Sequence, residues 1–267
     1  TSVAGEVIAP ASSAKGIAVV RTADGRIFGL ALADGKRQWV YQRPTPSLLL
    51  CSSAGSIAIE RNVIAGYPNG KLIGLDIEDG ELTWEVTVTQ PQGATELERI
   101  ADVAGLPVID GNKICAAAFQ GKVGCFEVQS RNLLWSRELS TGRDLALDAR
   151  HIYVVDNAGA VHALDKGTGA SVWKQDKLQY RKLTSPVLVD GRVVVGDGFG
   201  FLHVLSPEDG SIVGRLAGDG SAVLPLVPYL DTLRWVFIAA ALGGIAVAIY
   251  ARLDDWKRGR RWSRPSS

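Results

Sequence analysis

Residues 69–84 read Asn-Gly-Lys-Leu-Ile-Gly-Leu-Asp-Ile-Glu-Asp-Gly-Glu-Leu-Thr-Trp, and this phrase decides the fold. Gly70 can adopt the positive φ that a tight hairpin turn requires. The alternating residues after it predict a strand, and Gly80 predicts a second turn ten residues later. Trp84 follows in the next strand. The phrase therefore predicts two strands joined by tight turns, with a large aromatic side chain at its end.

The same phrase occurs five times in the chain. Its copies cover residues 24–39, 69–84, 120–135, 158–173 and 199–214. Only Arg131, in place of the second glycine, and Gly214, in place of the tryptophan, break the pattern. The copies end 45, 51, 38 and 41 residues apart, which leaves room for two more strands in each repeat. A period of about 40 to 50 residues with four strands per repeat is typical of β-propeller blades.

We therefore predict an all-β fold, a β-propeller, over residues 1–222. The predicted blades run over residues 5–43, 46–89, 95–139, 140–176 and 178–217. Four tryptophans at one repeat position are predicted to fill the space between adjacent blades: Trp39, Trp84, Trp135 and Trp173. The longest connection between blades is residues 90–103, and surface loops of this kind often carry function.

The charge distribution argues against nucleic-acid binding. The chain has 267 residues, 46% of them hydrophobic, and a net charge of +1. Residues 234–267 hold seven basic and two acidic residues, which leaves 22 basic and 26 acidic residues in the rest. Because the body is mildly acidic, it has no basic face that could displace counterions from phosphates.

The three cysteines do not resemble a disulfide framework, because they are few and odd in number. If Gln120 and Gly121 form a two-residue hairpin turn, Cys115 faces Phe126 across the hairpin. Cys115 and Cys125 would then project to opposite faces and could not bond. We therefore expect both of them, and Cys51, to be small buried residues.

No pattern of residues predicts catalysis, and we expect no enzyme activity, cofactor or metal. His162 and His203 occupy the same repeat position, three residues after a turn glycine, which favours a structural role. His151 stands alone. The aspartates lie mostly at turns, where their side chains bond nearby backbone. No phosphate-binding loop, HExxH or GxSxG motif is present.

The C-terminal part of the sequence predicts a transmembrane helix over residues 234–252, after a linker at 223–233. Residues 235–251 carry no charge, and a helix of that length measures about 26 Å, close to the thickness of a hydrocarbon core. Trp235 and Tyr250 mark its ends, where interfacial aromatics are found. The basic tail at 253–267 predicts a cytoplasmic C-terminus.

The repeat resembles that of quinoprotein-type propellers, and several segments outside it resemble the family of bacterial outer-membrane assembly factors named BamB. The resemblance covers residues 5 to about 222, and residues 95–103 are its most specific part. The other matching segments are Gly5–Ala9, Trp135–Leu139, Arg181–Leu188 and Val195–Asp197. It implies an eight-bladed periplasmic lipoprotein at the outer membrane. Because five blades and no N-terminal lipid-bearing cysteine are visible, we expect an N-terminally incomplete chain.

The same resemblance implies the function and the partners of the chain. It implies a non-catalytic scaffold that binds the barrel-assembly protein BamA, and possible clients are unfolded outer-membrane proteins. The residues that it assigns to partner binding are Phe126, Val128, Gln129, Arg181 and Leu183. The alternative is that Phe126 and Val128 serve only to fill the interior of the blade.

Two other functions stay open at this point. A quinone-dependent dehydrogenase fragment would share the repeat, although no adjacent pair of cysteines is present to support the quinone. A membrane-tethered sensor ectodomain would use the C-terminal helix for signalling. That helix also raises an alternative location, the inner membrane with a cytoplasmic C-terminus.

Overall fold

The structure, a computed structural model, describes residues 3, 5–7, 9–44, 46, 55–218, 220–223, 227–229 and 236–238. The chain divides into two compact units, Thr1–Gln179 and Tyr180–Ser267, and each is described by itself. Cys51, predicted to be a small buried residue, lies outside the described residues.

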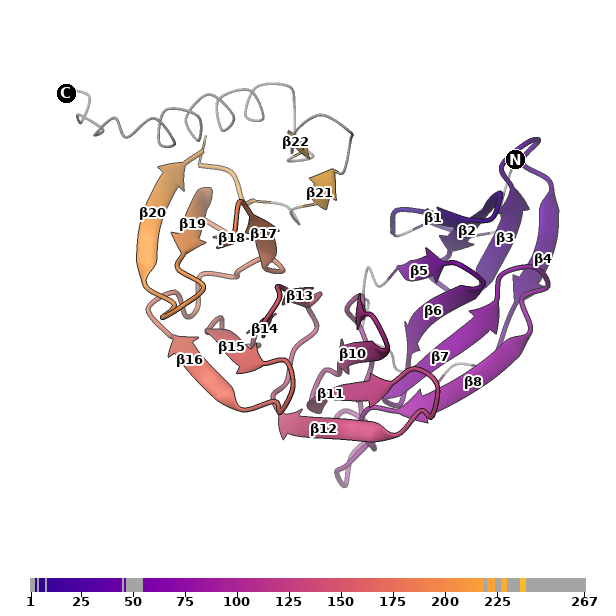
Figure 1. Cartoon of the computed structure of the whole chain (residues 1–267), viewed down its shortest axis with the longest axis horizontal. Coiled ribbons are helices and arrows are strands. Elements are labelled where there is room, and N and C mark those ends of the chain that lie inside the picture. The colour runs from indigo at the N-terminus through magenta and orange to yellow at the C-terminus, as the bar shows by residue number, and fades with distance from the viewer. Residues whose placement is uncertain are drawn as a thin grey trace. The chain divides into compact units, whose positions relative to one another are not determined.

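The described part of the first unit contains four sheets, each of four consecutive antiparallel strands (Figure 1). We refer to them as blades 1 to 4. Blade 1 consists of β1 (Ser12–Ala14), β2 (Ile17–Arg21), β3 (Ile27–Ala31) and β4 (Arg37–Tyr41). Blade 2 consists of β5 (Ser56–Ile59), β6 (Asn62–Tyr67), β7 (Lys71–Asp76) and β8 (Leu82–Thr87). Blade 3 consists of β9 (Val108–Asp110), β10 (Lys113–Ala117), β11 (Lys122–Glu127) and β12 (Leu133–Glu138). Blade 4 consists of β13 (Ala146–Leu147), β14 (His151–Val155), β15 (Val161–Asp165) and β16 (Ser171–Gln175).

The second unit contains blade 5 and a short two-stranded sheet among its described residues. Blade 5 consists of β17 (Val187–Val189), β18 (Arg192–Gly196), β19 (Phe201–Leu205) and β20 (Ile212–Ala217). The short sheet pairs β21 (Val227–Tyr229) with β22 (Val236–Ile238). The all-β prediction is confirmed.

The second turn of each repeat needs a left-handed residue, and this explains the repeated glycine. Gly80 has φ +74° and Gly169 has φ +72°. Arg131, which stands at the same position in blade 3, adopts φ +61° although it has a side chain. The break in the sequence pattern therefore leaves the backbone of the turn unchanged.

Neighbouring blades of the first unit share hydrophobic cores. Val19 and Ile27 of blade 1 pack in one cluster with Ile73 of blade 2, and all three are buried. Further clusters join blade 2 to blade 3 and blade 3 to blade 4. The central strands are therefore covered by a neighbouring sheet, as a propeller requires.

Trp39 and Trp135 lie at the blade boundaries, each against the second turn of the following blade. The Nε1 of Trp39 donates to the Ile77 carbonyl at 2.7 Å, and that of Trp135 donates to the Lys166 carbonyl at 3.1 Å. A β-carbon at Gly80 would stand 2.5 Å from the ring of Trp39. The turn glycine therefore serves a second purpose, because it makes room for an indole.

The other two tryptophans differ in burial. Trp84, which precedes the blade that carries Arg131, is half-buried, whereas Trp173 is 8% exposed. Within the first unit, the ring of Trp173 lies 5.9 Å from that of Tyr153.

The prediction that Cys115 and Cys125 stay unpaired is wrong. They are paired directly across β10 and β11 and joined by a disulfide, with Cα atoms 4.0 Å apart. The last paired residues are Ala117 and Val123, so the loop is longer than a two-residue turn. This moves the register by one residue, which changes the face of every side chain on the strand. Burial of both cysteines is confirmed.

This disulfide gives a testable prediction. When the denatured, unreduced protein is alkylated, mass spectrometry should find one modified cysteine, Cys51, and three after reduction. A double Cys115→Ser/Cys125→Ser variant should lose about 3 kcal/mol of unfolding free energy, because the bond closes a loop of about ten residues. Alkylation of all three cysteines before reduction would contradict the pairing.

The predicted transmembrane helix is not supported by the described residues. Val236–Ile238, near its predicted start, form β22 and pair with β21. The rest of the predicted span, including Trp235 and Tyr250, lies outside the described residues. Within the described part of the chain, no helix has the length and hydrophobicity needed to cross a membrane.

Candidate functional site

The connection between β8 and β9 is ordered by its own side chains. The Glu98 carboxylate accepts hydrogen bonds from the backbone N–H groups of Ala94 at 2.8 Å and Thr95 at 3.1 Å. In return, the Thr95 hydroxyl accepts one from the Glu98 N–H at 3.2 Å. This reciprocal pair is a capping box. The same backbone N–H groups lower the pKa of Glu98, because they stabilise its ionised form.

Further bonds hold this connection against blades 2 and 3. The Val103 N–H donates to the Tyr67 carbonyl at 3.2 Å, and the Asn69 N–H donates to the Asp102 carboxylate at 3.3 Å. The side-chain nitrogen of Gln120, in the amide orientation that satisfies its neighbours, donates to the carbonyls of Leu97, Glu98 and Ile100 at 3.0–3.2 Å. The longest inter-blade connection is therefore a shaped part of the first unit.

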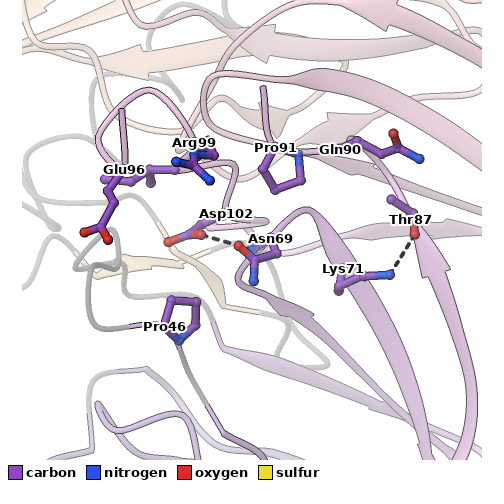
Figure 2. Close-up of a pocket in the computed structure, with 10 residues that line it drawn as sticks. Pro46, Asn69, Lys71, Thr87, Gln90, Pro91, Glu96, Arg99 and Asp102 are labelled. Carbon is purple, nitrogen blue, oxygen red and sulfur yellow. Dashed lines mark hydrogen bonds between the residues drawn. The ribbon is translucent and has the colours of Figure 1, made fainter. Parts of the chain in front are cut away.

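A pocket of about 580 Å³ lies between this connection and blade 2. Figure 2 shows Asp102 and Asn69 in the middle of the lining residues, with Glu96 and Arg99 to one side and Pro46 below. Its lining residues are Pro46, Asn69, Lys71, Thr87, Gln90, Pro91, Glu96, Arg99, Ile100 and Asp102. Most of these residues are polar or charged, with both signs of charge, and none of the lining residues that the structure describes is aromatic.

The charged groups of the pocket differ in how far they are already engaged. Lys71 forms an ion pair with Glu85 at 3.0 Å and donates to the Thr87 hydroxyl, also at 3.0 Å. Glu96 and Arg99 form no ion pair with any residue that the structure describes, but the Arg99 guanidinium donates to the carbonyls of Thr95 and Ala94, each at 3.4 Å. Leu97, between them, is 68% exposed. The exposed side chains of Glu96, Leu97 and Arg99, called here the rim of the pocket, therefore offer a carboxylate, an apolar group and a guanidinium to a ligand.

The residues predicted to bind a partner in blade 3 differ in accessibility. Phe126 is 5% exposed and packs in the core between blades 2 and 3, and Val128 is half-buried against the same core. Gln129 is exposed. The burial of Phe126 therefore fits a role in the interior of the blade. Of these three residues, Gln129 is the one that a partner could reach.

The other two predicted residues belong to the second unit. Leu183 is 1% exposed. The Arg181 guanidinium is partly exposed, and its Nε donates to the Asp197 carboxylate at 2.6 Å. Because Phe126, Val128 and Gln129 belong to the first unit, the five residues do not form one described site.

Asp197 is the centre of a buried polar cluster in blade 5. One of its oxygens accepts from Arg181 and faces Nε2 of His203 at 2.8 Å, and the other accepts the N–H groups of Phe199 and Phe201. Although burial opposes ionisation, these bonds lower the pKa of Asp197 to about 2. The carboxylate can therefore only accept, so the His203 Nε2 carries a proton.

Burial lowers the pKa of His203, and the nearby Asp197 carboxylate only partly opposes this effect. Its Nδ1 is buried without a hydrogen-bond partner among the described residues. His162 of blade 4 pairs with Asp156 in the same way, at 2.9 Å. No cluster of histidine, cysteine and acidic residues in the described part of the chain could hold a metal ion.

The sequence pattern indicates the connection at residues 90–103 as a functional region, but it predicts neither the pocket beside it nor the Asp197 cluster. The Thr-x-x-Glu pattern at Thr95 and Glu98 is a capping-box signature that could have predicted an ordered connection there. No comparable signal connects Arg181 to Asp197, sixteen residues away.

Four-stranded antiparallel blades with a repeated turn glycine and a tryptophan at their boundaries define a β-propeller of the quinoprotein-like repeat class. A family model described as outer membrane protein assembly factor BamB matches residues 1–175. The chain belongs to this BamB family.

Curated relatives and solved structures agree with this assignment. The chain is 44% identical over 85% of its length to the outer membrane protein assembly factor BamB of Nitrosomonas eutropha, and 39% identical over 83% to that of Burkholderia pseudomallei. It spans 56% and 58% of the length of these two relatives. The crystal structure of BamB from Moraxella catarrhalis matches with a TM-score of 0.82 and 28% identity, covering 90% of this chain and 72% of that one.

Propeller dehydrogenases are similar in fold only. A quinohemoprotein alcohol dehydrogenase from Comamonas testosteroni matches with a TM-score of 0.62 at 16% identity, over 88% of this chain and 46% of that one. This likeness concerns the fold alone and identifies no residue that would support dehydrogenase activity.

Proposed function

We propose that the chain acts as a non-catalytic scaffold in outer-membrane protein assembly. In this proposal it lies on the periplasmic face of the outer membrane, where it binds the barrel-assembly protein BamA and assists the insertion of β-barrel clients. Its curated relatives are named as outer membrane protein assembly factors, which supports a role in that assembly. The disulfide between Cys115 and Cys125 supports the location, because such bonds persist in oxidising compartments such as the periplasm.

The observation that carries the proposal is the pocket beside the ordered connection between β8 and β9. Because its walls are fixed by the capping box and by the Gln120 amide, a partner that binds there does not have to order them. Its mixed charges and exposed polar groups suit a polypeptide segment, which offers both main-chain polar groups and side chains. We assign the contact to Leu97 and Arg99 on the rim, with Gln129 and Arg181 as further contact residues implied by the family resemblance.

Binding to BamA tests this proposal. A Leu97→Asp/Arg99→Glu variant should bind immobilised BamA at least about tenfold more weakly, a loss of about 1.4 kcal/mol, because it removes the apolar and the cationic group of the rim. Both side chains are exposed, so the variant should keep the unfolding midpoint of the wild type.

Leu82→Asp is the matched control, because Leu82 is an exposed leucine of the same unit that lies on β8 and not in the connection between β8 and β9. It should bind BamA like the wild type. Equal binding by the rim variant and the control would remove the pocket from the proposal, and the same comparison with Gln129→Glu tests the blade 3 contact.

A further inference from the structure

The segment that leads into blade 5 carries an unusual exposed surface. Tyr180 is 83% exposed, and Phe199, in the turn between β18 and β19, is 55% exposed. The two stretches are in contact, because the Gly198 N–H donates to the Arg181 carbonyl at 2.8 Å. A β-carbon at Gly198 would also lie 3.3 Å from that of Lys182. The stretch that carries Tyr180, Arg181 and Lys182 therefore lies against the turn that carries Phe199.

The backbone of this segment is held in an uncommon conformation. Tyr180 has φ +62° and Lys182 has φ +54°, on either side of Arg181. Left-handed residues with side chains cost about 1 kcal/mol or more each, and they persist where surrounding contacts fix them. Here the fixing contact is the Arg181 guanidinium, which is bound to the fully buried Asp197 at 2.6 Å. The exposed side chains are thus presented by a rigid backbone.

Cations and aromatic rings alternate across the same surface. The Arg181 guanidinium carbon stands 4.8 Å from the ring centre of Phe199 and 5.8 Å from that of Phe201. The guanidinium carbon of Arg215, on β20, lies 3.7 Å from the ring centre of Phe201. Stacking of this kind fixes both the rings and the guanidinium groups before any ligand arrives.

The surface has an excess of positive charge. Asp197 compensates Arg181, but Lys182 and Arg215 have no ion-pair partner among the residues that the structure describes. Both residues are exposed. A partner with carboxylates would therefore meet two available cations beside two exposed aromatic faces.

We propose that Tyr180, Lys182, Phe199 and Arg215, called here the blade-5 patch, bind an extended acidic peptide segment of a partner protein. Carboxylates of the segment pair with Lys182 and Arg215, and apolar side chains between them pack on Tyr180 and Phe199. Two exposed cations and two exposed rings fit an extended peptide that carries both acidic and apolar residues. This proposal goes beyond the scaffold function and does not depend on the pocket in the first unit.

A peptide-binding measurement on the full chain tests the patch. The probe is a fluorescent peptide of alternating glutamate and leucine, and fluorescence polarisation reports its binding. Binding should weaken as sodium chloride rises from about 0.05 M to about 0.5 M, because salt screens exposed charges. Lys182→Glu/Arg215→Glu should weaken it by at least about tenfold, and Tyr180→Ala/Phe199→Ala by a similar factor.

Lys36→Glu and Leu32→Ala serve as matched controls, because both residues are exposed and belong to the first unit, whereas the blade-5 patch belongs to the second. They should bind the acidic peptide like the wild type, and a peptide of alternating lysine and leucine should not bind the wild type. Equal affinity for the two peptides, or unchanged affinity in the charge-reversed variant, would overturn the proposal. So would concentration-dependent dimerisation that Tyr180→Asp abolishes without any peptide binding, since the patch would then contact a second copy.

Discussion

Trp39→Ala should lower the unfolding free energy by about 3–5 kcal/mol, because it empties the space between blade 1 and blade 2. The indole is 7% exposed, and its N–H donates to the Ile77 carbonyl. On one side it meets Gly29 of its own blade and on the other Gly80 of the next. Chemical denaturation followed by tryptophan fluorescence and circular dichroism measures the loss.

Two companion variants separate the parts of this effect. Trp39→Phe keeps most of the volume and loses the hydrogen bond, so it should cost less than the alanine variant. Trp84→Ala removes a half-buried indole and should also cost less. If Trp39→Ala costs no more than Trp84→Ala, the close fit against Gly80 does not contribute to stability.

Asp197→Asn should have a comparable effect, with a loss of about 3–5 kcal/mol, because it leaves buried polar groups without their charged partner. The carboxylate is fully buried and accepts from both Arg181 and His203, whereas an amide oxygen offers fewer lone pairs. The variant should also weaken peptide binding at the blade-5 patch, because Arg181 holds that segment in place. Equilibrium unfolding and the fluorescence assay measure the two effects.

Asp156→Asn is the matched control, since Asp156 occupies the same repeat position in blade 4 and pairs with His162 alone among the described charged residues. It should cost about 1–2 kcal/mol. Equal losses in the two variants would show that Arg181 adds nothing to the cluster.

The pH dependence of stability supplies a second measure of the same carboxylate. The pKa of Asp197 is lowered to about 2 from an ordinary value of 3.8, so the unfolded state takes up its proton first as the pH falls. Its stabilising contribution is therefore complete above pH 3.8 and is lost between there and about pH 2. This loss amounts to about 2 kcal/mol, and it should be absent from Asp197→Asn.

The blades could be predicted from sequence because their positions depend on local chemistry. A glycine with positive φ recurs where a hairpin turns. A tryptophan at a fixed distance along the sequence recurs where the next blade packs. Arg131 shows the limit of this reasoning, because its backbone follows the repeat although its side chain does not. The second purpose of Gly80, to make room for an indole of the preceding blade, depends on packing between blades and appeared only in the structure.

The disulfide and the candidate sites depend on details that a sequence pattern does not determine. A difference of one residue in the loop after Ala117 decided whether Cys115 and Cys125 face each other or point apart. One side of the pocket is formed by the connection that follows blade 2, and this connection is bound by Gln120 of blade 3. The pairing of Arg181 with Asp197 joins two segments whose residue types are ordinary for loops and turns. Each of these features requires knowledge of register or of long-range contact.

Trp39 and Trp135 each dock onto the blade that follows in the chain, which gives these two boundaries a direction. Trp39 meets its carbonyl partner 38 residues later in the chain, and Trp135 meets its partner 31 residues later. Because a chain is synthesised from its N-terminus, blade 1 and blade 3 each have an uncovered indole until the next blade has been synthesised. We therefore expect these two blade boundaries to be completed in order from the N-terminus. A chain cut short after blade 1 or blade 3 should expose an indole that the full chain buries.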